Sequence, residues 1–84
     1  MTFFVYILKS ELDNSFYVGQ TANLKERLSR HNKGYNRSTR LKRPWKIIYY
    51  ETYKSRSEAM KLEKRIKSWK KREAIVKYIE SKKI

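Results

Sequence analysis

Three side chains that could act together on a phosphate lie close to one another in the sequence: Tyr17, Arg27 and His31. At about 100° per residue along a helix, Leu24 and Leu28 define a buried stripe. His31 falls between these leucines and Arg27 lies on the flank, so both point towards the edge of the core. An arginine held there needs an anionic partner, and a phosphate matches the two-pronged geometry of a guanidinium. The spacing therefore predicts a phosphate-binding site.

The net charge favours the same kind of partner. The 84 residues include 22 Lys and Arg against 8 Asp and Glu, which gives a formal charge of +14. This excess predicts binding to nucleic acid, driven by the release of counterions. An acidic membrane surface is the alternative. The aromatic content of 14% and the well-patterned strands favour a folded globule over a basic amphipathic tail.

Composition also limits the chemistry and the location. The chain has no cysteine and one histidine, which excludes thiolate metal sites and makes zinc a poor candidate. A hard divalent ion held by oxygen atoms is compatible with the sequence. The apolar run Phe3–Leu8 is too short for a signal peptide or a membrane span, and Lys9 ends it. We therefore expect one cytoplasmic domain over residues 1–84, with no membrane association.

The elements that must position these side chains can be read from periodicity. Phe3–Leu8 is apolar on both faces and aromatic, which predicts a central strand. Turn-forming residues follow it, so Phe16–Gln20 is expected to pair with it as an antiparallel hairpin, with Gly19 where the backbone turns. Tyr6 and Tyr17 meet if the register allows. A helix then begins at a capping box of Asn23 and Glu26, and Gly34 ends it.

The next segment, Tyr35 to Pro44, is predicted to be a loop. It carries four cations that form a candidate clamp for the DNA backbone: Arg37, Arg40, Lys42 and Arg43. A solvated basic loop without a nucleic-acid contact explains the same residues equally well.

The second half of the chain predicts one strand and two helices. Trp45–Tyr53 is β-branched and aromatic, hence a third strand. Ser55 caps the next helix, whose buried stripe contains Ala59, Leu62, Ile66 and Trp69, and a last helix runs over residues 72–81. Glu63 lies at the margin of the apolar arc among many cations. We predict an α/β fold, a small three-stranded antiparallel sheet flanked by helices in the order β-β-α-β-α-α.

These residues together resemble the GIY-YIG nuclease superfamily. The resemblance rests on order and spacing over nearly the whole chain: Phe4-Val5-Tyr6, Tyr17-Val18-Gly19, Arg27, His31 and Glu63. It is greatest to the small stand-alone bacterial members, which are similar to the N-terminal nuclease domain of the excision-repair incision subunit and to the catalytic domain of some homing endonucleases. The first motif departs from the family name, because Phe-Val-Tyr stands in place of Gly-Ile-Tyr.

The resemblance implies a metal-dependent endonuclease that hydrolyses DNA, with DNA repair or recombination as its setting. In the family scheme, Tyr6 or Tyr17 orients and deprotonates water, and Arg27 clamps the phosphate. Glu63 holds one Mg²⁺ or Mn²⁺, and His31 bonds a tyrosine or shares the proton transfer. A positive charge from Arg27 and the metal is expected to lower the tyrosine pKa. Without an appended DNA-binding domain, a protein partner that delivers the substrate is also compatible with the sequence.

Each residue also has a structural explanation. The two tyrosines could be a cross-strand aromatic pair, and Glu63 could pair with Lys67 one turn later. Arg27 could be a solvated cation, and His31 could bond the last carbonyls of its helix. Together these explanations require several coincidences in one ordered pattern, so we favour the nuclease. The alternatives are a catalytically silent nucleic-acid-binding module with the same fold and a basic RNA- or ribosome-associated protein.

Overall fold

The central strand of the sheet is β1 (Phe3–Ser10), which is mostly buried on both faces. The computed structural model describes residues 1–69 and 71–82. In it, β1 pairs antiparallel with β2 (Phe16–Thr21) on one side and with β3 (Trp45–Tyr53) on the other, which gives the order β2-β1-β3. The predicted three-stranded antiparallel sheet with its first strand in the centre is confirmed.

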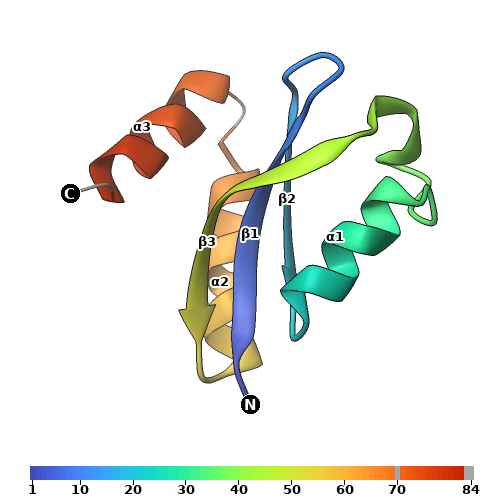
Figure 1. The fold of residues 1–84 in the computed structure, drawn as a ribbon. Helices are drawn as coiled ribbons and strands as arrows, with labels where there is room; N and C mark the ends of the chain where they lie inside the picture. The colour runs from blue at the N-terminus through green and yellow to red at the C-terminus, as the bar shows by residue number, and fades with distance from the viewer. Residues whose placement is uncertain (70, 83–84) are drawn as a thin grey trace.

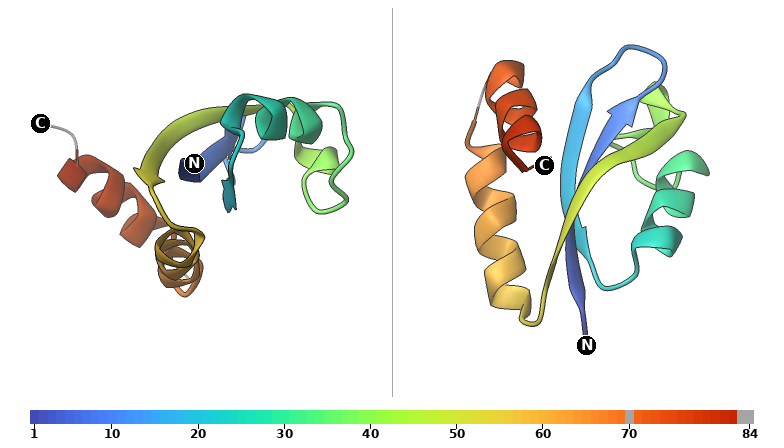
Figure 2. Two further views of the ribbon diagram at one scale, coloured as in Figure 1. Left: turned by 90° about the horizontal axis from the view of Figure 1, so that it is seen from below. Right: turned by 60° about the vertical axis from the view of Figure 1, so that its left-hand side comes forward.

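Helices cover both faces of this sheet (Figures 1 and 2). One face carries α1 (Leu24–Asn32), and the other carries α2 (Arg56–Lys67) and α3 (Arg72–Lys82). The predicted element order is confirmed. The segment between α1 and β3 is not a continuous loop as predicted, because it contains a short 3₁₀ helix, η1 (Arg40–Lys42). No helix in the described part of the chain is long and apolar enough to cross a membrane.

The sheet divides the core into two unequal parts, because successive side chains of β1 point to opposite faces. The larger part, on the α2 and α3 face, consists of apolar side chains: Phe3, Val5, Ile7, Val18, Ala59, Leu62, Ile66, Ile75 and Ile79. The smaller part, on the α1 face, combines Tyr6, Leu8 and Trp45 with Leu24 and Leu28. Two nearly fully buried polar side chains, His31 and Thr39, belong to the α1 side of the sheet.

Both predicted helix starts are confirmed by their caps. The Asn23 side chain accepts a hydrogen bond from the backbone N–H of Glu26 at 3.0 Å, and the Ser55 hydroxyl accepts one from Glu58 at 3.2 Å. The predicted end of α1 is also confirmed. Gly34 has φ of +82°, the left-handed conformation that closes a helix C-terminus and that suits a residue without a Cβ.

A second polar group lies on the α2 and α3 face, where α3 meets β3. The Glu51 carboxylate accepts hydrogen bonds from Tyr49 at 2.6 Å, from Tyr53 at 2.9 Å, and from Tyr78 of α3. We call these four residues the Glu51 cluster. It ties the last helix to the sheet, and both oxygens of its carboxylate accept from tyrosine hydroxyls.

Candidate active site at the edge of the sheet

The Tyr6 side chain fits under α1 because its partner on the neighbouring strand has no side chain. Its neighbour on β2 is Gly19, and a Cβ at that position would collide with the Tyr6 hydroxyl. The expectation that the backbone turns at Gly19 is therefore wrong, because β2 continues to Thr21. Gly19 instead provides the space in which the Tyr6 ring lies, 1% exposed.

Tyr17 lies diagonally across from Tyr6 on the same face. The two ring centroids are 6.5 Å apart, so the register does bring the two tyrosines together. The half-buried Tyr17 ring also meets the His31 ring edge-on at 4.9 Å and the Trp45 ring at 6.3 Å. Aromatic contacts of this kind fix the orientation of Tyr17 while leaving part of it accessible.

His31 is fully buried and hydrogen-bonded at both ring nitrogens. Nε2 lies 3.2 Å from the Tyr6 hydroxyl, and Nδ1 lies 2.8 Å from the hydroxyl of Thr39. Both ring nitrogens of His31 are therefore used by these two hydroxyls. The alternative explanation, in which His31 bonds the last carbonyls of its own helix, is wrong.

The C-terminal end of α1 is fixed to the start of β3. The Asn32 amide donates to the carbonyl of Trp45 at 3.0 Å and accepts from the N–H of Trp45 at 2.6 Å. The Trp45 indole N–H in turn donates to the carbonyl of Thr39 at 2.8 Å. These bonds hold His31, one residue before Asn32, and Thr39 at fixed positions.

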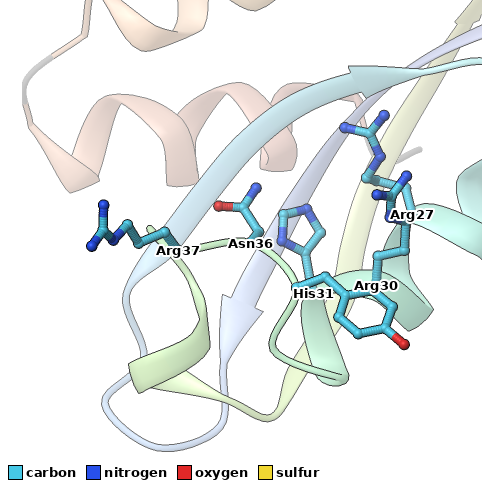
Figure 3. Close-up of a pocket in the computed structure, with 6 residues that line it drawn as sticks. Arg27, Arg30, His31, Asn36 and Arg37 are labelled. Atoms are coloured by element: carbon cyan, nitrogen blue, oxygen red, sulfur yellow. The ribbon is translucent and has the colours of Figure 1, made fainter.

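Arg27 lines a basic hollow of about 350 Å³ beside His31 (Figure 3). Two further arginines, Arg30 and Arg37, line the hollow together with His31, Tyr35 and Asn36. Guanidinium groups supply paired donors that suit phosphate oxygens. The hollow therefore has the charge and the donors to hold a phosphate next to His31.

The structure separates the four cations of the predicted clamp. Arg37 lines the hollow, whereas Lys42 forms an ion pair with Asp13 at 3.5 Å. The Arg43 guanidinium packs against Gly34. Arg40, Lys42 and Arg43 are all exposed at the surface and do not line the hollow.

Glu63 reaches the same edge of the sheet from α2. Its side chain is 18% exposed and pairs with Lys67 at 3.2 Å, the spacing of one helical turn. The Lys67 ammonium lies 5.8 Å from the centre of the Tyr17 ring. Glu63 is therefore connected to Tyr17 through Lys67, and its charge raises the pKa of Tyr6, although it comes from the opposite layer. The pairing with Lys67 considered above is present.

Burial controls the ionisation of the two central groups. It raises the pKa of Tyr6, and the charge of Tyr17 raises it further, whereas Arg27 lowers it by less. Arg27 thus acts on Tyr6 in the expected direction, but the net pKa of Tyr6 is raised, because loss of hydration outweighs the attraction of one cation. Burial, and then the charge of Arg27, lowers the pKa of His31, so its imidazole is neutral at pH 7.

Four residues of this region were not predicted from the sequence: Arg30, Tyr35, Asn36 and Thr39. The spacing of Arg27 and Arg30 on one helix was a signal for a second arginine beside the first. The other three belong to a segment without periodicity, so their contacts depend on the path of the chain between α1 and β3.

A sheet that brings two tyrosines, a histidine, an arginine and a glutamate to one edge is typical of one class of phosphodiesterase. A family model described as the GIY-YIG catalytic domain matches residues 2–78. The chain therefore belongs to the GIY-YIG nuclease family, and the resemblance found in the sequence is confirmed.

Within the family, the chain is similar to small bacterial UPF0213 proteins. It is 39% identical over 73 residues to a UPF0213 protein of Staphylococcus haemolyticus, an alignment that covers 86% of this chain and 88% of that protein. A UPF0213 protein of Staphylococcus epidermidis is 40% identical over 67 residues, 79% of this chain and 80% of the relative. The solution structure of a UPF0213 protein from Bacillus halodurans has a TM-score of 0.64 and 29% identity, and covers 98% of this chain and 86% of that one.

Proposed function

We propose that this protein is a metal-dependent endonuclease that hydrolyses DNA phosphodiester bonds. The observation that supports it most is the bond between the buried Tyr6 hydroxyl and a neutral His31, beside an arginine-lined hollow. A hydrolase needs a group that takes a proton from water and cations that neutralise the phosphate. Both are present at one edge of the sheet.

Tyr6 and His31 act together on the proton of the attacking water. Because the Tyr6 pKa is raised, its phenolate is scarce at neutral pH. Tyr6 accepts a proton from water while its own proton passes to Nε2 of His31, a step that the hydrogen bond between them prepares. Tyr17, which is partly exposed beside His31, orients the water or the phosphate. Either tyrosine is a candidate for direct contact with the water.

The arginines bind the substrate. Arg27 would clamp the scissile phosphate, because it lines the hollow and its charge acts on Tyr6. Arg30 and Arg37 line the same hollow and would hold neighbouring phosphates of the strand. The basic loop with Arg40, Lys42 and Arg43 would extend the contact along the backbone, where charge rather than sequence determines affinity.

Glu63 is the residue that would hold one Mg²⁺ or Mn²⁺. Residues 1–69 and 71–82 contain no group of three or more His, Asp or Glu side chains suited to a metal. A single carboxylate nevertheless fits Mg²⁺, which often binds through one or two carboxylates, substrate phosphate and water. The ion would neutralise charge on the phosphate and its leaving oxygen. Glu63 would have to exchange its ion pair with Lys67 for this ion.

One observation favours a second candidate function. Lys67 already neutralises the charge of Glu63, so the site can bind a phosphate backbone without any metal. A catalytically silent module that binds DNA or RNA would have this arrangement. A basic RNA- or ribosome-associated protein would share the charge but would need neither Glu63 nor the Tyr6–His31 pair.

The biological setting follows from the proposed activity. We infer DNA repair or recombination as the setting, with a protein partner that would direct the protein to its substrate. Its location in the cytoplasm remains a prediction from the sequence.

The proposal is tested by incubating the purified protein with labelled duplex, flap, junction and single-stranded DNA, each with Mg²⁺, Mn²⁺ or EDTA. We expect cleavage of at least one substrate with a metal and none with EDTA. Arg27→Gln should abolish this cleavage, whereas Arg65→Gln on the outer surface of α2 serves as a control of equal charge change. If no substrate is cut with either metal while DNA is bound, the silent binding module is the correct function.

A further inference from the structure

The hydroxyl of Thr39 has no part in the mechanism described so far, although it is 1% exposed and lies 2.8 Å from Nδ1 of His31. Its carbonyl accepts the Trp45 indole N–H, and its backbone N–H donates to the carbonyl of Asn36 at 3.2 Å. Both ends of the residue are thus fixed. These two backbone hydrogen bonds hold Thr39 so that its hydroxyl faces His31.

The neighbours of the two hydroxyls determine where the imidazole carries its proton. Among the described side chains, the Tyr6 hydroxyl has one hydrogen-bond partner, Nε2 of His31 at 3.2 Å. The nearby charge of Arg27 acts on the same hydroxyl, but a guanidinium has only donors and cannot accept its proton. His31 is therefore the acceptor that the structure offers to the Tyr6 proton. The Thr39 hydroxyl has another acceptor for its own hydrogen, the carbonyl of Asn36 at 3.4 Å.

Only one tautomer satisfies both hydroxyls. If Nε2 carried the hydrogen, it would face the Tyr6 oxygen, and the Tyr6 proton would have no acceptor among the described side chains. If Nδ1 carries it, Nδ1–H donates to Thr39, Thr39 donates to Asn36, and Nε2 is free to accept from Tyr6. A hydrogen bond at one ring nitrogen generally sets which nitrogen is protonated in this way.

We propose that Thr39 is a positioning residue, whose hydroxyl accepts the Nδ1–H of His31 and holds the imidazole in the tautomer that receives the Tyr6 proton. It acts through His31 and touches neither water nor phosphate. The kinetic consequence rests on the proposed nuclease function, whereas the tautomer is a property of the folded protein alone.

The chain contains a single histidine, so ¹⁵N-labelled histidine gives one pair of ring-nitrogen signals without assignment. At a pH where His31 is neutral, we expect a protonated Nδ1 and an unprotonated Nε2 in the wild type. Thr39→Ser should keep this pattern, and Thr39→Val, which has nearly the same shape without the hydroxyl, should shift the proton towards Nε2. A wild-type spectrum with the proton on Nε2 would overturn the proposal before any variant is made.

Cleavage provides the second measurement. Relative to the wild type, Thr39→Val should lower the rate about 10–100-fold, by analogy with the loss of a partner that orients a metal-binding histidine, and Thr39→Ser should keep most of the rate. An unchanged tautomer and rate in a folded Thr39→Val protein would contradict the proposal. If the wild type cuts no DNA, the proposed function fails, but the ring-nitrogen signals still decide the role of Thr39.

Discussion

The protein buries tyrosine hydroxyls on both faces of one small sheet, but with opposite partners. On the α2 and α3 face, the Glu51 cluster surrounds a carboxylate with three donors. On the α1 face, the site cluster, defined as Tyr6, Tyr17, His31 and Thr39, contains a neutral imidazole beside an open basic hollow. The first group is closed and complete. The second has an acceptor for a proton and room for an anion.

The two clusters also differ in what their hydrogen bonds do to ionisation. Burial raises the pKa of Glu51, but the tyrosine hydroxyls lower it more, so the net pKa lies below its usual value. Burial and Glu51 together raise the pKa of Tyr53 to about 12. In the Glu51 cluster, the carboxylate therefore stays ionised and Tyr53 stays protonated at neutral pH. In the site cluster, His31 is neutral and Tyr6 protonated, which is the starting state for a proton transfer.

The largest expected difference comes from removing one hydroxyl on each face. Tyr6→Phe should lower the rate of DNA cleavage by about 10²–10⁴-fold, because proton transfer by a positioned side chain contributes that much. Tyr78→Phe should leave the rate per folded molecule unchanged and lower the free energy of unfolding by about 1.5–3 kcal/mol, since it removes a bond to a charged acceptor. Single-turnover cleavage and urea unfolding measure the two effects. Equal rates for the two variants would remove the functional distinction between the clusters.

The next effect concerns stability alone. Glu51→Gln replaces a carboxylate oxygen with an NH₂ group that cannot accept from the tyrosines, and should cost about 2 kcal/mol of unfolding free energy. The amides of α3 should exchange faster with deuterium, because Tyr78 ties this helix to β3. Glu80→Gln, at an exposed position of α3, is the matched control. A stability equal to that of the control would show that the Glu51 cluster does not hold α3.

A smaller effect distinguishes the hollow from the loop beside it. The double variant Arg30→Gln, Arg37→Gln should weaken DNA binding and make the salt dependence shallower, by about 0.9 for each duplex phosphate that the protein no longer neutralises. The double variant Arg40→Gln, Arg43→Gln removes the same charge from residues outside the hollow, and should change the slope less. Binding by fluorescence anisotropy over a range of salt concentrations measures both. A larger change from the loop pair would place the main DNA-binding surface on the loop.

The smallest expected effect is on the pH dependence of stability, to which the two clusters contribute in different pH ranges. The pKa values of His31 and Glu51 are lowered from ordinary values of 6.5 and 4.5, so the folded state binds fewer protons than the unfolded state. Each contribution to stability is complete above the ordinary pKa and is lost as the pH falls below it. Stability should therefore begin to fall below pH 6.5 through His31 and fall further below 4.5 through Glu51.

Urea unfolding at a series of pH values measures this order. His31→Gln should flatten the first part of the curve and leave the second part in place. A wild-type stability that stays constant until the pH is well below the range of histidine would contradict the buried, neutral state of His31.

The sequence predicted the parts of the site that depend on local periodicity. Alternation along each strand predicted that Tyr6 and Tyr17 meet if the register allows, and the observed register brings them to one face. The helical wheel placed Arg27 and His31 at the core edge, and the Tyr6–His31 hydrogen bond agrees with this for His31. The close approach of Tyr6 to Gly19 was not predicted, because a glycine in a sequence does not show whether it lies inside a strand or at the end of one.

The remaining parts depend on contacts between distant segments. Thr39 and Asn36 reach the site because Asn32 and Trp45 fix the ends of their segment, and no pattern within residues 35–44 indicates that path. Glu63 was predicted with two partners, a metal and Lys67, because the same helical spacing serves both. The structure shows the Lys67 pair, and the metal remains a proposal.

The central claim is that Glu63 and the site cluster form one metal-dependent nuclease site. Glu63→Gln tests it most directly, because the amide keeps the shape of the side chain and loses its charge. Glu80→Gln, on the outer face of α3, controls for the change of one charge.

The measurement is single-turnover DNA cleavage at saturating Mg²⁺, together with DNA affinity in EDTA and urea unfolding. We expect Glu63→Gln to suppress cleavage strongly, to keep or slightly increase metal-free affinity, and to change stability by only about 0.2–0.5 kcal/mol, the worth of a helical ion pair. Cleavage by Glu63→Gln at the wild-type rate would contradict the metal site and leave Glu63 as the partner of Lys67 alone.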